Sequence, residues 1–138
     1  MSNIATVSAD LELRMVVPGE PSLPVVASLH YTAEDPWAVS VTFAGEDMPA
    51  PITWLFARAL LTEGVSGLVG DGDVRVWPSG RAEGRVVSIA MTSPSGAAVF
   101  ETDRNSLVEF LQQTYLAVPT GCEGERVDLD AELALLLS

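Results

Sequence analysis

The sequence predicts an α+β domain in which two antiparallel β-sheets pack against helices. Apolar and polar residues alternate with a period of two in several segments, as expected for half-buried strands. Short turns rich in proline and glycine separate these segments and favour antiparallel connections. Two later segments carry apolar residues three and four positions apart, the spacing of an amphipathic helix.

The first half of the chain is predicted to form four strands, over residues 7–17, 25–31, 37–43 and 52–56. In the third strand Trp37, Val39, Val41 and Phe43 form one apolar row, which we expect to face the core.

The second half begins with a predicted short helix at residues 57–63, with Gly64 as its left-handed cap. The glycines that follow, at positions 67, 70 and 72, indicate a turn. The sequence then predicts strands at 73–77, 85–92 and 97–101, a helix at 103–117 capped by Asp103, and a helix at 128–137.

Length and composition indicate one domain over residues 1–138, because 48% apolar residues suffice for one core. The formal charge is −12, with 19 acidic side chains against seven basic ones, all arginine. This balance argues against nucleic acid as a partner and against binding to anionic lipid. The sequence has no basic leader before an apolar run and no stretch of about 20 apolar residues, so we expect a cytoplasmic protein without direct membrane insertion.

The residue types argue against an enzyme. His30, the single histidine, has the polar parity of its strand and is most simply an exposed or rim residue. Cys122, the single cysteine, lies in an acidic segment that disfavours a reactive thiolate. Asp71 and Asp73 lack the further ligands of a calcium loop, and the neighbouring glycines lack the Gly-Lys-Ser/Thr of a phosphate loop. We therefore expect no catalytic residue, no metal and no cofactor.

Three residues are candidates for contact with another protein. Trp77 shares the parity of Arg75, opposite Val74 and Val76, so its ring can face a groove or another subunit. Arg58, in the short helix, is either a surface cation or half of an ion pair with Glu63.

WLFARALLTEGV at residues 54–65 and GDVRVWPS at residues 72–79 resemble the SsgA-like proteins, a family of sporulation and cell-division proteins of actinomycetes. LELRMVV, LVEFLQQT and VDLDAEL match the family pattern in the same order, so the likeness covers nearly the whole chain, and it is greatest to the SsgB type.

The resemblance implies a Whirly-like fold, that of certain single-stranded nucleic-acid binders, and assembly as a homotrimer. It also implies a non-enzymatic role in sporulation-specific septation, in which the protein recruits or stabilises the tubulin-like protein FtsZ at the septum in concert with an SsgA-type paralogue. The alternative function is single-stranded nucleic-acid binding. A single-strand binder needs a positive groove with exposed stacking rings, and the charge of this chain is the reverse.

Overall fold

The computed structural model describes residues 5–16, 19–46, 48–67, 69–71, 73–79, 85–94 and 96–122. The predicted helix at 128–137 lies outside these residues. The first half forms strands β1 (Thr6–Val16), β2 (Leu23–Thr32), β3 (Asp35–Ala44) and β4 (Ile52–Ala57), followed by helix α1 (Arg58–Gly64). The second half forms β5 (Val69–Asp71), β6 (Val74–Pro78), β7 (Val86–Ser93) and β8 (Gly96–Asp103), followed by helix α2 (Arg104–Ala117).

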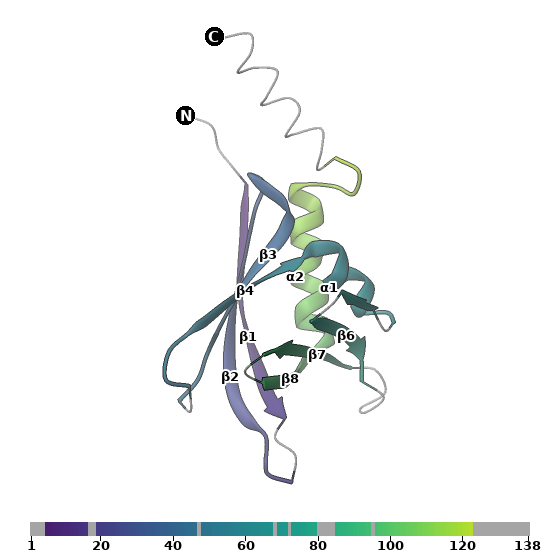
Figure 1. The fold of residues 1–138 in the computed structure, drawn as a ribbon. Coiled ribbons are helices and arrows are strands. Elements are labelled where there is room, and N and C mark those ends of the chain that lie inside the picture. Colours follow the sequence, from purple (N-terminus) through teal and green to yellow (C-terminus); the bar gives the residue numbers. More distant parts are fainter. Residues whose placement is uncertain are drawn as a thin grey trace.

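The eight described strands belong to one antiparallel sheet, in the order β4-β3-β2-β1-β8-β7-β6-β5. The prediction of two separate sheets is therefore wrong, although the α+β class is confirmed. The two halves join where the end of β1 pairs with β8, from Leu13 opposite Thr102 to Val16 opposite Val99. These residues of β1 lie at its C-terminal end, where β8 pairs with the edge that β2 does not occupy. In Figure 1 the β6–β8 half crosses the β1–β4 half, with α2 beside both.

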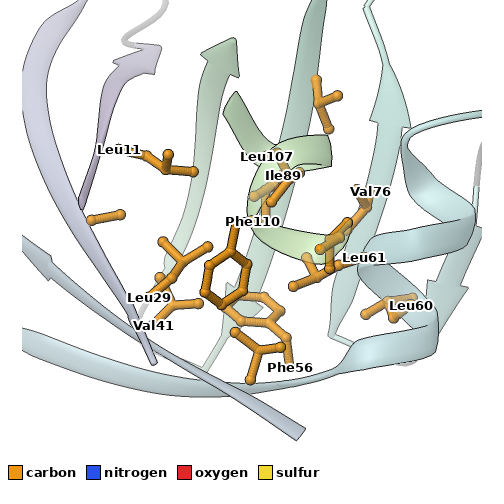
Figure 2. Packing of buried hydrophobic residues seen from close by; sticks show 14 of the residues in the cluster. Leu11, Leu29, Val41, Phe56, Leu60, Leu61, Val76, Ile89, Leu107 and Phe110 are labelled. Carbon is orange, nitrogen blue, oxygen red and sulfur yellow. The ribbon is translucent and has the colours of Figure 1, made fainter. Parts of the chain in front are cut away.

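The core lies on the face of the sheet that the helices cover. Figure 2 shows Phe110 and Leu107 of α2 pointing toward Leu29, Phe56 and Ile89 of the strands. The two halves of the sheet also meet directly, because the ring of Phe43 in β3 stacks on that of Phe100 in β8 with centroids 4.7 Å apart. One cluster of buried residues thus extends over both halves of the described sheet.

Helix α2 begins where the sequence predicts. The Asp103 carboxylate accepts a hydrogen bond from the Ser106 backbone N–H at 2.9 Å, which satisfies one of the free donors of the first turn. No described helix has both the length and the apolar content that a membrane span needs.

Gly64 is needed for close packing and not for a left-handed cap, so that prediction is wrong. It belongs to the last turn of α1 and is buried, and the cap residue Val65 has an ordinary right-handed φ of −74°. A Cβ at position 64 would overlap the Cγ1 and Cβ atoms of Val76 in β6. The absence of a side chain therefore lets α1 approach the sheet.

Two further features differ from the prediction. Residues 69–71, predicted as a turn because of their glycines, form the short strand β5, in which Gly70 pairs with Arg75. Trp37 is 58% exposed, whereas Pro36 beside it is buried. The register between β2 and β3 shifts near His30 and Thr32, and this irregularity ends the inward row at Val39.

Candidate protein-interaction surface

Strand β6 presents Arg75 and Trp77 on the face of the sheet that points away from the core. Val74 and Val76 of the same strand are buried, Arg75 is exposed and Trp77 is half-buried, as the alternation predicts. Antiparallel pairing with β7 places Ala90 opposite Arg75 and Ser88 opposite Trp77. Small residues on β7 therefore leave room beside the two large side chains.

Arg75, Trp77 and Pro78 of β6, Ala90 of β7 and Val99 of β8 line an open hollow of about 560 Å³, which we call the β6 groove. Ala90 lies opposite Val99 in the register, so the apolar floor continues across two strands. Arg75 is the single charged residue of this lining. The groove thus combines an aromatic ring, an apolar floor and one cation, which are typical features of protein-interaction sites.

Gly70 of β5 lies beside Arg75 without lining the groove, and the sequence did not predict this contact. A Cβ at this position would lie 3.0 Å from Arg75 Cγ, so a larger residue would displace the arginine stem. The sequence feature that could have indicated this contact is a glycine inside a short strand, because such a glycine often marks the close approach of a neighbouring group. That signal was assigned to a turn because three glycines occur close together.

Arg58 is not a surface cation, and this part of the predicted surface is wrong. Its side chain is only 2% exposed. Nη1 donates to the carbonyl oxygens of Thr114 at 3.1 Å and Val118 at 2.8 Å, at the C-terminal end of α2. The guanidinium carbon lies 3.9 Å from the ring centroid of Tyr115 and 5.1 Å from that of Tyr31.

This arrangement makes Arg58 a buried link between α1 and α2. A cation at the C-terminal end of a helix is favourable, because the last carbonyl groups carry partial negative charge. The two tyrosine rings add cation–π attraction. The carbonyl groups that bind Arg58 lie more than fifty residues further along the chain. The sequence of the short helix α1 therefore gives no sign of this contact.

His30 lies at the exposed face of β2, as predicted, where Ser8 Oγ is 3.0 Å from its Nδ1. Cys122 is half-buried and packs against the core. Within the part of the chain that the structure describes, no three histidine, cysteine, aspartate or glutamate side chains gather closely enough to hold a metal ion.

A small α+β domain with an apolar groove on one face of its sheet fits a class of proteins that act by binding other proteins. A family model described as "Streptomyces sporulation and cell division protein, SsgA" matches residues 25–123. The chain belongs to this family, which acts in sporulation and cell division.

Curated relatives and solved structures agree with this assignment. A relative from Streptomyces coelicolor, named sporulation-specific cell division protein SsgB, is 49% identical over 96% of each chain. One of the same name from Frankia casuarinae is 48% identical, over 96% of this chain and 92% of its own. The structure of an SsgA-like sporulation-specific cell division protein from Thermobifida fusca superposes with a TM-score of 0.87 and 41% identity, over 97% of this chain and 98% of the other. A further structure, from work reporting that mutations in SsgB correlate to longitudinal cell division during sporulation of Streptomyces coelicolor, has a TM-score of 0.81 and 48% identity over 88% and 95%.

Proposed function

We propose that the protein recruits or stabilises FtsZ at sporulation septa, in concert with an SsgA-type paralogue, and that it does so without catalysis. It works in the cytoplasm and is concentrated at the septum. Relatives named as sporulation-specific cell division proteins support the process. The β6 groove is the single structural observation that carries the proposal, because it offers another protein an apolar surface with an aromatic anchor and a cation.

The charge of the chain determines how this contact works. A protein with a formal charge of −12 gains little long-range attraction from another acidic protein. Binding therefore depends on short-range burial of Trp77 and Ala90, with Arg75 pairing a carboxylate of the partner. A contact of this kind weakens only mildly as salt rises, because apolar burial is not screened.

Cosedimentation with FtsZ polymers tests the proposal. We expect Trp77→Ala to weaken binding by about 30-fold and Arg75→Ala by about tenfold, the effects typical of an aromatic hot spot and a charged rim contact. Trp37→Ala is the matched control, since Trp37 is an exposed tryptophan on β3, outside the groove. If the wild type neither pellets with the polymer nor changes its assembly, direct recruitment is wrong. If all three folded variants pellet equally well, the groove is not the contact surface.

The assembly that we propose is a homotrimer with a Whirly-like fold. The crossing of two four-stranded halves beside α2 supports this fold. Light scattering across micromolar to millimolar protein should give a mass of three protomers. A mass of one protomer throughout that range would remove the trimer from the proposal.

The β6 groove also has features that the alternative function would need. Bases of single-stranded nucleic acid stack on aromatic rings such as Trp77, and cations such as Arg75 bind the phosphate backbone. The charge of −12 opposes that use. We expect labelled single-stranded DNA and RNA to bind no more tightly than the non-specific range of about 10⁻⁴ to 10⁻⁶ M at physiological salt. Fluorescence anisotropy measures this, and submicromolar binding that falls steeply with salt would favour the nucleic-acid function.

A further inference from the structure

Strand β4 forms one edge of the described sheet, and it has no charge, internal proline or bulge of its own. The sheet order places β3 on one side of it and no described strand on the other. Edge strands commonly carry a charge, an internal proline or a bulge that prevents pairing with another chain. β4 reads ITWLFA, and residues 48–57 carry no charge in a chain whose formal charge is −12. Within the part of the chain that the structure describes, no strand pairs with the outer side of β4.

The side chains of β4 are unusually exposed for apolar residues. Ile52 is 48% exposed and Leu55 is 68% exposed. Because successive residues of a strand point to opposite faces, Ile52 shares the core-side face with Trp54 and Phe56, and Leu55 lies on the other face. The edge thus shows apolar surface on both sides.

A second hollow lies beside β4 on the core side of the sheet, and we call it the β4 pocket. Its volume is about 460 Å³, and no residue of α1 or α2 lines it. The lining contains no charged side chain and includes three methionines, which adapt readily to the shape of an apolar group. It consists of Met15, Phe43, Met48, Ile52, Trp54, Met91, Thr92, Gly96, Ala97, Ala98 and Phe100.

We propose that the β4 edge and the β4 pocket together bind an extended segment of a partner protein, which adds to the sheet as a further strand. A strand paired with β4 sends every second side chain to the face that carries Ile52 and Trp54, and so toward the pocket. Backbone hydrogen bonds along the edge supply affinity, and the pocket selects the alternate side chains.

The charges of the site define the segment that it binds. An uncharged apolar lining disfavours an ionised side chain, since burying an unpaired charge is costly. The acidic field of the chain favours basic residues at the two ends of the segment, outside the pocket. The partner segment is therefore extended, with apolar residues at every second position and lysine or arginine on its flanks.

This site is separate from the β6 groove. Arg75 and Trp77 lie on the face of the sheet opposite Val76, whereas Met91 of the β4 pocket lies on the core side. The two surfaces can be occupied together, so the proposal does not depend on FtsZ binding.

A labelled synthetic peptide of about ten residues tests it, with leucine and valine alternating with threonine and a lysine at each end. The control peptide has serine in place of the apolar residues. We expect saturable binding of the first peptide only, weakened about tenfold or more by Ile52→Asp and less than about threefold by Leu55→Asp. These substitutions are matched, because both residues are exposed aliphatics of β4 and only Ile52 lines the pocket. Circular dichroism verifies that each variant is folded.

Hydrogen exchange identifies the binding mode. Strand addition should slow exchange of the β4 amides that point away from β3, whereas a peptide bound elsewhere leaves them unchanged. Failure of the alternating peptide to bind, equal weakening by both substitutions, or binding without protection of β4 would each overturn the proposal. It would also be overturned if β4 pairs with a second copy, seen as self-association that Ile52→Asp abolishes while no peptide binds.

Discussion

Replacing Arg58 with alanine is expected to lower the free energy of unfolding by about 3 to 5 kcal/mol, because two buried carbonyl oxygens each lose a hydrogen bond to a charged donor, worth about 1.5 to 3 kcal/mol. The variant loses two hydrogen bonds to backbone carbonyls of α2 and the contacts with Tyr31 and Tyr115. It also leaves a space between α1 and α2 where the arginine stem was buried. The midpoint of thermal unfolding should fall by on the order of 10 °C or more, as measured by circular dichroism.

Arg104→Ala provides a graded comparison. Arg104 Nε donates one hydrogen bond to the Val65 carbonyl oxygen at 2.9 Å and is only partly buried, so its loss should cost about 1 kcal/mol. Arg75→Ala, at an exposed position, should change stability by less than about 0.5 kcal/mol. Equal unfolding midpoints for all three variants would show that the buried position of Arg58 does not contribute to stability.

Gly64→Ala is the second substitution with a large expected effect, a loss of about 1 to 3 kcal/mol. Alanine is normally favoured over glycine in a helix by about 1 kcal/mol, so propensity alone predicts the opposite sign. The added Cβ would overlap atoms of Val76, whose side chain is buried in β6 and cannot turn away easily. Overpacking therefore outweighs propensity at this position.

A double-mutant cycle separates these two effects. Val76→Ala alone should destabilise by about 1 to 3 kcal/mol through loss of buried methyl groups. Combined with Gly64→Ala, it removes Val76 Cγ1, the nearer of the two atoms that the new Cβ would overlap, although Val76 Cβ remains. The double variant should therefore be more stable than the sum of the single effects implies, without full relief of the overlap. Strict additivity in denaturant titrations would contradict the close approach of α1 to β6.

Local sequence patterns predicted the structure correctly where the interactions that form an element lie within a few residues of one another. The alternation in residues 7–17 and 25–31 predicted strands whose odd-numbered described residues are buried or half-buried, because one side of each strand faces the core and the other faces water. Asp103 predicted the start of α2 for a similar reason, since an N-cap bonds a backbone N–H only three residues away. The parity of Arg75 and Trp77 likewise placed both on the outer face of β6.

The errors arose where a distant segment determines the environment of a residue. Gly64 is predicted as a left-handed cap from the backbone freedom of glycine, whereas glycine is needed there because a side chain would overlap Val76 in β6. Arg58 is predicted as a surface residue because it is charged, whereas its guanidinium group donates hydrogen bonds to carbonyl groups at the end of α2. The two halves form one sheet because β1 pairs with β8, which is distant in sequence, and no local pattern predicts this pairing.

The sequence by itself determined the fold class, most of the strands, helix α2, and the family that the chain resembles. It did so because period, turn chemistry and capping act over a few residues, and because an ordered set of motifs extends along the chain. Only the tertiary structure decided that the strands form one sheet, that Arg58 is buried between two helices, and that Gly70 makes room for Arg75. It alone placed β4 at an edge of the described sheet beside an apolar pocket, because the strands that line this pocket are brought together by folding.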